Sequence, residues 1–292
     1  MEKMKTHSKK ITGLILASVL LFAACSTQPK NSGDVFDLRK QAESHLDLGN
    51  KLSDRGDNAE ALRMINEAQR LAKITDDPSL IIRTSLSRGN VLMNIQQFDE
   101  ASQEFETALA ESLRMGNREL TAVSRIHIAR YKLFRGLAPA QQIKQELAGE
   151  LGFIKSDTLY IAFAWVVSGL AEKELGSYAE AEAAVKRALN LHEKGLYLEQ
   201  AAYDWYLIGS FRSLNKDYSG AREALTQALA LDRRIENSYG LATDWRALGD
   251  IYAKAGNAEE SKAAYLRSAD IFRALGSTEA AEEAEQRIHA AQ

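Results

Sequence analysis

The sequence contains a single cysteine, Cys25, among its 292 residues. A chain with one cysteine forms no internal disulfide, so oxidative cross-linking does not hold this fold together. Only 3 prolines are present, and no stretch shows the two-residue alternation of a half-buried strand. These absences favour a helical protein whose stability comes from packing.

Signals of catalysis are also missing. No glycine-rich phosphate loop and no paired His/Glu metal spacing occurs. No two of the five histidines are close in sequence; they are His7, His45, His127, His192 and His289. We therefore expect no catalytic residue, metal site, cofactor or small-molecule substrate, and do not expect an enzyme.

Basic charge is not in excess either. The chain has 37 basic and 40 acidic residues, with a formal net charge of −3. Nucleic-acid binding needs a basic patch, so we expect no nucleic-acid partner.

The N-terminus has the pattern of an export signal. Four lysines lie in the first ten residues, and the apolar stretch Ile11–Ala24 follows and ends at Cys25. This stretch is shorter than the roughly 20 residues that a spanning helix needs. Removal of residues 1–24 would take the formal charge from −3 to −6.

The residues "FAAC", ending at Cys25, resemble the bacterial lipobox, although Leu21 stands one place earlier than in the usual pattern. The resemblance implies a lipoprotein signal peptide over 1–24, cleavage before Cys25 and attachment of acyl chains, including palmitate, to Cys25. Because Ser26 rather than Asp follows, it also implies the outer membrane of a bacterial cell envelope, facing the periplasm. The alternative is an ordinary signal peptide with an incidental cysteine.

The rest of the chain repeats with a period of 40 residues. Trp165, Trp205 and Trp245 recur at this spacing, and each is followed four residues later by a glycine. A ladder of small residues and a ladder of mainly apolar residues run in the same register. The first ladder is Gly49, Gly89, Ala129, Gly169, Gly209 and Gly249, and the second is Ile65, Phe105, Gln145, Val185, Leu225 and Tyr265. Self-similarity at a fixed period is typical of solenoid proteins.

Each copy predicts two helices, and Trp245, Leu248, Gly249 and Tyr252 match the first half of the tetratricopeptide repeat motif. The chain resembles a 40-residue variant of that family. The resemblance implies an all-α, right-handed α-solenoid of six helix hairpins with a C-terminal capping helix. The expected segments are a lipidated tether at 25–34, six repeats within 35–276 (about 42–81, 82–121, 122–161, 162–201, 202–241 and 242–276) and a cap at 277–292.

The tryptophans and glycines are expected to form the structural core: Trp165, Trp205, Trp245, Gly169, Gly209 and Gly249. An aromatic binding box is the alternative for the three tryptophans, but their fixed spacing at a core motif position favours packing.

The family register also implies a concave groove lined by the first helix of each hairpin. It places Asn90 and Arg130 on this face in repeats two and three. Towards the middle we expect a partner-binding set: Val123, Ile126, Phe163, Val166, Tyr203 and Tyr206. The alternative is that longer helices, the tether or the cap bury these residues.

The leading interpretation is a lipid-anchored periplasmic scaffold that binds a protein or peptide of the envelope, for assembly of a pilus, secretion or outer-membrane complex. A peptide-sensing regulator and an adaptor for peptidoglycan enzymes remain as alternatives. The sequence does not identify the partner.

Overall fold

The computed structural model describes residues 32–155 and 157–290, which form thirteen α-helices and no strand. The helices are α1 (Ser32–Asp54), α2 (Asn58–Ile74), α3 (Pro78–Asn94), α4 (Phe98–Met115), α5 (Arg118–Phe134), α6 (Ala140–Leu151), α7 (Thr158–Glu174), α8 (Tyr178–Gly195), α9 (Leu198–Leu214), α10 (Tyr218–Arg234), α11 (Ser238–Lys254), α12 (Ala258–Ala274) and α13 (Thr278–Ala290).

Part of the expected N-terminal organisation lies outside the described residues. This part comprises the predicted signal peptide, Cys25 and residues up to 31. Helix α1 begins at Ser32, so residues 32–34 belong to the first helix rather than to the tether.

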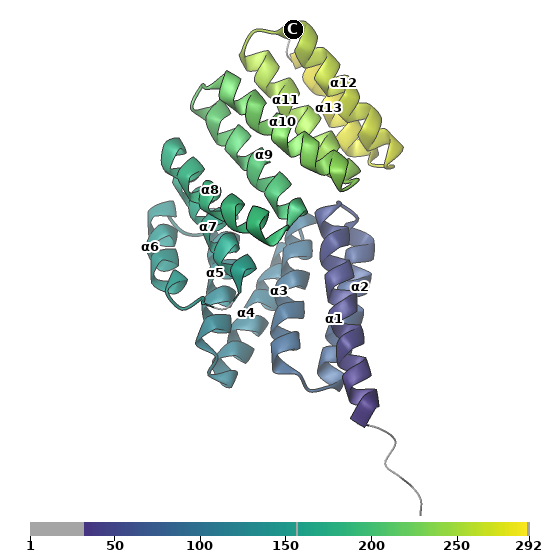
Figure 1. Cartoon of the computed structure of the whole chain (residues 1–292), viewed down its shortest axis with the longest axis vertical. Coiled ribbons are helices and arrows are strands. Elements are labelled where there is room, and N and C mark those ends of the chain that lie inside the picture. Colours follow the sequence, from purple (N-terminus) through teal and green to yellow (C-terminus); the bar gives the residue numbers. More distant parts are fainter. Residues whose placement is uncertain (1–31, 156, 291–292) are drawn as a thin grey trace, which may run out of the picture.

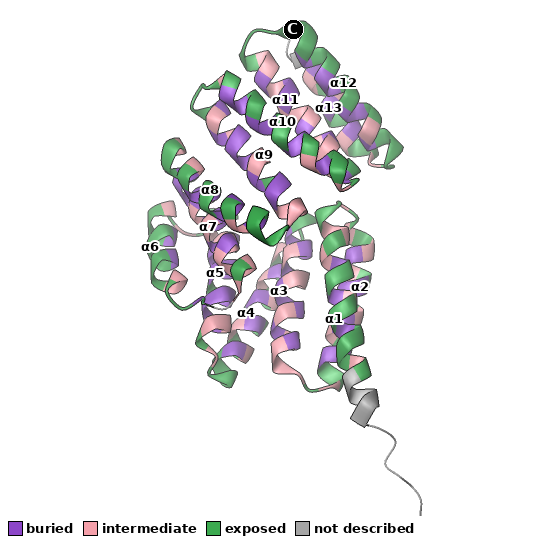
Figure 2. Cartoon of the chain, in the orientation of Figure 1, coloured by how far each residue is buried: buried purple, intermediate pink, exposed green. Residues whose placement is uncertain are grey.

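The helices stack as hairpins into a curved array (Figure 1). Each odd-numbered helix packs along the even-numbered helix that follows it, and α13 packs on α12 at the C-terminal end. Buried residues form stripes on the faces that neighbouring helices share, and exposed residues lie on the outside (Figure 2). The predicted all-α solenoid is confirmed.

Most of the turns that join successive helices contain a residue with a left-handed backbone conformation, and these residues recur at intervals of 20 positions. The residue is Gly at 56, 116, 136, 176, 256 and 276, and a larger residue at 76, 96, 196, 216 and 236. At six of the helices an Asp or Asn side chain then caps the N-terminus; the Asp57 carboxylate, for example, accepts from the Glu60 amide at 3.2 Å. The structural period is therefore one helix and its turn.

The small-residue ladder lets the two helices of each hairpin approach closely. A Cβ built on Gly169 would lie 2.7 Å from Val185 Cγ2, and one on Gly209 would lie 2.9 Å from Leu225 Cγ. At Gly249 the neighbour is the Tyr265 ring. In each case the contact is with the residue 16 positions later, a member of the second ladder.

Repeat three departs from this register. The loop between α5 and α6 is longer than the other turns within hairpins, and α6 has 12 residues. Its buried residues are Ile143 and Leu147, two positions after the expected places, and Gln145 is exposed. Residue 145 therefore does not pack on the small-residue ladder, which is why Ala129 can carry a Cβ where the other repeats have glycine.

Candidate functional site

The odd-numbered helices form the inner side of the array. Contacts join α1 to α3, α3 to α5, α5 to α7 and α9 to α11, whereas successive even-numbered helices have no contacts of similar extent. Helices on the inside of a curved stack are closer together than those on the outside, so we call the surface of the odd helices the inner face.

Three of the residues predicted to line the groove are buried instead. Val123 and Ile126 are each 1% exposed, and Val166 is 7% exposed. The first two belong to the core cluster of repeats two to four, and Val166 packs with repeats four and five. The prediction must be corrected here, because packing between successive hairpins already covers these side chains.

Phe163, Tyr203 and Tyr206 keep accessible surface on the inner face, and the first two lie near polar residues of α5. Phe163 stacks on the His127 ring with centroids 4.3 Å apart, and the Arg130 guanidinium lies 5.8 Å from the Phe163 centroid. Tyr203 and Tyr206 stack at 6.1 Å. We call this set the inner-face cluster: Asn90, His127, Arg130, Phe163, Tyr203 and Tyr206.

Asn90 organises the polar side of this cluster. Its Oδ1 accepts from Arg130 Nη1 at 3.0 Å and from His127 Nδ1 at 3.2 Å. Burial, together with the positive charge of Arg130, lowers the pKa of His127 to about 3. His127 is therefore neutral at physiological pH, and Arg130 carries the positive charge of this group.

Arg130 has no carboxylate partner among the described residues. Its only hydrogen bond there is to the neutral Asn90 side chain, and its other neighbours are the Phe163 ring and the Tyr203 hydroxyl. Burial lowers the pKa of Arg130, although a guanidinium stays protonated at neutral pH. A recessed, uncompensated cation attracts an anionic group.

The two tyrosines keep accessible surface within this enclosed environment. Tyr203 is 49% exposed, and Tyr206 is half-buried. The surrounding protein nevertheless raises the pKa of both hydroxyls, so both remain neutral hydrogen-bonding groups. The register already placed Asn90 and Arg130 on this face, but only the structure shows that Arg130 has no carboxylate partner in the part of the chain that it describes.

The predicted core residues behave in two ways. Gly169, Gly209 and Gly249 are buried in the hairpins. The three tryptophans are half-buried against the core. Arginines lie over two of them: Arg187 is 4.3 Å from the Trp165 ring centroid, and Arg267 is 4.6 Å from that of Trp245. The tryptophans therefore pack on the core and form no open aromatic box.

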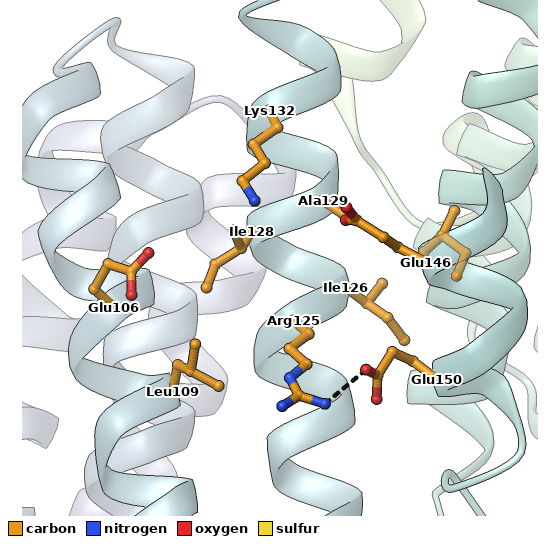
Figure 3. A pocket seen from close by; sticks show the side chains of 10 residues that line it. Glu106, Leu109, Arg125, Ile126, Ile128, Ala129, Lys132, Glu146 and Glu150 are labelled. Atoms are coloured by element: carbon orange, nitrogen blue, oxygen red, sulfur yellow. Dashed lines mark hydrogen bonds and ion pairs between the residues drawn. The ribbon is translucent and has the colours of Figure 1, made fainter. Parts of the chain in front are cut away.

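A cleft of about 350 Å³ lies between α4, α5 and α6 (Figure 3). Its walls carry both charge signs, and Arg125 Nη1 donates to Glu150 Oε1 at 2.8 Å across it. Arg125 occupies the position that tryptophan has in repeats four to six. The cleft therefore marks the departure of repeat three, and Arg125, one of its two cations, is already paired with Glu150.

Within residues 32–155 and 157–290 there is no cluster of His, Cys, Asp and Glu suited to a metal, and no helix long and apolar enough to cross a membrane. His192 Nδ1 lies 2.6 Å from Asp204 Oδ2, but the two side chains are 4% and 0% exposed. This pair resembles part of a catalytic triad, but it lies between helices where no substrate reaches it.

The same two positions one repeat later hold Asp232 and Asp244. Asp232 accepts from Asn237 Nδ2 at 3.0 Å. Burial raises the pKa of Asp232 to about 6 and, with Asp232 as its neighbour, that of Asp244 to about 9. Asp232 stands where the preceding repeat has His192. Two buried acids therefore occupy the place of a His–Asp pair.

Comparison with known proteins agrees with this architecture. The family model of the tetratricopeptide repeat matches residues 245–274, which lie in the last hairpin. A Rap protein complexed with competence and sporulation factor has a similar fold, with a TM-score of 0.59 and 16% identity over 86% of this chain and 74% of that one. No curated protein gave a significant match.

Two further solved structures are similar. BtubC (BKLC) from P. vanneervenii has a TM-score of 0.55 and 18% identity over 82% of this chain and 92% of its own. PilW, a widely conserved type IV pilus biogenesis factor, has a TM-score of 0.50 and 16% identity over 83% and 97%. At these identities the similarity shows the fold, a solenoid of tetratricopeptide-like hairpins.

Proposed function

We propose that this protein is a lipid-anchored scaffold of the bacterial cell envelope that holds a peptide segment of a partner protein on its inner face. The observation that carries the proposal is the inner-face cluster, where the recessed Arg130 has no carboxylate partner in the described residues and lies beside partly exposed aromatic rings.

The chemistry of the cluster selects the segment. A carboxylate pairs with a guanidinium through charge-assisted hydrogen bonds, which are stronger than neutral ones. An aromatic or aliphatic side chain next to it would pack on Phe163, Tyr203 and Tyr206, in the way that aromatic anchors fill interface centres. The proposed ligand is therefore a peptide with an acidic group adjacent to an apolar side chain.

The test is selection of peptides from a displayed random library on the full chain. We expect enrichment of Asp or Glu, or of a free C-terminal carboxylate, beside an apolar residue. Arg130→Gln should abolish the acidic preference. The matched control is Arg114→Gln, which removes an exposed arginine that is already paired with Glu111 on α4. Equal acidic enrichment on both variants would refute the assignment.

A second variant tests the aromatic half of the site. Phe163, Tyr203 and Tyr206 changed together to Ser should lose the preference for apolar side chains while circular dichroism remains helical. Unchanged apolar enrichment with an intact fold would exclude these rings as the contact surface.

The envelope location rests on the export signal and the lipobox-like segment before Cys25. Acyl chains on Cys25 would confine the solenoid to a membrane surface, since more than one chain is needed for stable anchoring. Confinement raises the effective concentration of the solenoid near membrane partners. Labelled palmitate should enter the parent protein and not Cys25→Ser; labelling of neither would refute the anchor.

Two of the similar structures support a binding role without defining it. The Rap structure contains a bound competence and sporulation factor, so the architecture is compatible with holding a ligand. PilW is a pilus biogenesis factor, which agrees with a role in assembly of an envelope machine. The identity of the partner is left to the peptide selection.

A further inference from the structure

Two distant parts of the chain meet at one place, which we call the junction. It consists of the end of α1 with the turn that follows (residues 54–57), the start of α9 (Glu199 and Gln200), and the turn after α10 with the start of α11 (residues 235–239). In Figure 1 the end of the α1–α2 hairpin lies against the ends of α9 and α10. The N-terminal hairpin thus contacts the fifth hairpin (α9 and α10) and the sixth (α11 and α12), so distant parts of the curved array touch.

Two hydrogen bonds cross the junction. Gln200 Nε2 donates to Asp54 Oδ2 at 3.2 Å, and Arg55 Nη2 donates to the Ile235 carbonyl at 3.3 Å. The residues of these pairs are 146 and 180 positions apart in the sequence. Ordinary contacts between successive hairpins do not produce such pairs.

The closest packing at the junction is between Gly56 and Tyr239. A Cβ added to Gly56 would lie 2.4 Å from Tyr239 Cδ2. Tyr239 is held from behind by Phe272, whose ring centroid is 5.6 Å away in an edge-on arrangement. Gly136, Gly176 and Gly256 occupy the equivalent turn position, and a Cβ there would meet nothing within 4 Å. Gly56 alone among these four glycines therefore serves a long-range contact.

We propose that the junction is a releasable latch, which closes the solenoid in one state and frees the α1–α2 hairpin from α9 and α11 in another. Two hydrogen bonds at exposed side chains and one ring contact contribute little net free energy. A contact of this size leaves the closed and open forms close in free energy, as a two-state element requires.

Charge at the junction supports release. The protein that surrounds Asp54, and then the Glu199 carboxylate, raise the pKa of Asp54 to about 7, while the residue itself keeps accessible surface. The Glu199 carboxylate also helps to raise the pKa of Asp232, and Asp232 in turn helps to raise the pKa of Asp244. Four carboxyl groups therefore lie in succession from the junction into α11. The junction segments also carry the carboxylates Asp57 and Glu236. The neighbouring cations are Arg55, which binds a carbonyl, and Arg233, which partly offsets Asp244.

The sign of the pH effect follows from these directions. An acid whose pKa is raised by closing holds its proton better in the closed form. Closing therefore takes up protons, and the closed form is favoured as the pH falls. As the pH rises through about 7, Asp54 ionises beside Glu199 and the repulsion between the two carboxylates favours opening.

The latch would regulate the inner-face cluster, a consequence that rests on the proposed function. Tyr203 lies one helical turn after Glu199 on α9, so the junction fixes the end of the helix that carries Tyr203 and Tyr206. Release would let α9 move relative to α1 and α3 and change the width of the inner face. Whether the junction opens can be measured without any peptide.

The experiment is hydrogen–deuterium exchange by mass spectrometry on the full chain, with Gly56→Asn and Gly256→Asn as a matched pair. Both glycines have a left-handed φ, +79° and +80°, which asparagine tolerates. We expect about tenfold faster exchange at both 54–57 and 235–239 in Gly56→Asn. Gly256→Asn should match the parent at both segments. Equal exchange in the two variants would overturn the latch.

Two further measurements keep the proposal testable if Gly56→Asn folds poorly. Gln200→Leu, which removes the hydrogen bond to Asp54, should also raise exchange at 54–57. Small-angle X-ray scattering of the parent should show a larger radius of gyration at pH 8.5 than at pH 6, and Asp54→Asn should reduce that difference. An unchanged radius between the two pH values, with Gln200→Leu exchanging like the parent, would refute the latch. Failure of peptide selection would bear only on the proposed function.

Discussion

Asp244 is a carboxyl group buried in α11, and its substitution by asparagine gives the sharpest test of the structure. The residue is 2% exposed, and its Oδ2 is among the few buried side-chain atoms of the described residues without a hydrogen-bond partner. Burial, followed by the neighbouring Asp232, raises its pKa from 3.8 to about 9. At pH 7 the folded protein therefore holds a proton that the unfolded chain releases.

The magnitude follows from linkage between protonation and folding. One pKa unit corresponds to about 1.4 kcal/mol, so holding this proton at pH 7 costs the folded state up to about 4 kcal/mol. Since the folded-state pKa is the higher one, this cost is absent below about pH 4 and grows until about pH 9. Asp244→Asn requires no proton, so it should stabilise the protein by about 2–4 kcal/mol at pH 7 and by almost nothing at pH 4.

The assay is urea unfolding followed by circular dichroism at pH 4, 7 and 8.5, with the variant compared with the parent at each pH. Asp270→Asn is the control, because the Asp270 side chain is 74% exposed. Its effect on the free energy of unfolding should not grow between pH 4 and pH 8.5. A variant no more stable than the parent at pH 7 and 8.5 would show that Asp244 is not a buried, protonated acid.

Three further results are expected. Gly169→Ala should destabilise the protein by about 1–3 kcal/mol in urea unfolding, because the new Cβ would lie 3.0 Å from the Ala181 carbonyl oxygen. Ala129→Gly should cost only about 1 kcal/mol through lost helix propensity. Equal costs would contradict the close helix packing inferred at the glycine positions of the small-residue ladder. Phe211→Ala, at a site 1% exposed, should cost about 3–5 kcal/mol and more than Trp205→Ala, since Trp205 is half-buried. His127→Gln should remove part of the fall in stability that the parent shows as the pH drops from about 6.5 to 5, because the pKa of His127 in the folded protein is about 3 whereas the unfolded imidazole takes up a proton near 6.5; a variant whose stability falls over this range as steeply as the parent's would show that His127 is not a buried, neutral imidazole.

The sequence by itself determined the architecture, because a repeat leaves a regular mark. Each hairpin buries the same positions, so Trp165, Trp205 and Trp245 and the glycines that follow them had to recur at the period of the fold. The 16-residue relation between Gly209 and Leu225 could likewise be obtained from the two ladders. Where the ladders failed, at Gln145 and its neighbours, the structure also departs from the regular register.

The composition of the inner face was decided by tertiary packing. The register assigned Phe163 and Tyr203 to that face together with Val123, Ile126 and Val166, and it could not show that the last three are buried, because burial there depends on how far each hairpin rotates against the next. It also could not show that Arg130 has no ionic partner within residues 32–155 and 157–290, since the partners of a charge come from other helices.

The junction is entirely a product of the tertiary structure. No local pattern distinguishes Gly56 from Gly176 or Gly256, since all three end a helix with the same left-handed turn. Only the accumulated curvature of the successive hairpins brings Gly56 against Tyr239. A repeat sequence fixes the contacts between neighbours, whereas contacts between its distant parts depend on small rotations that add up along the whole array.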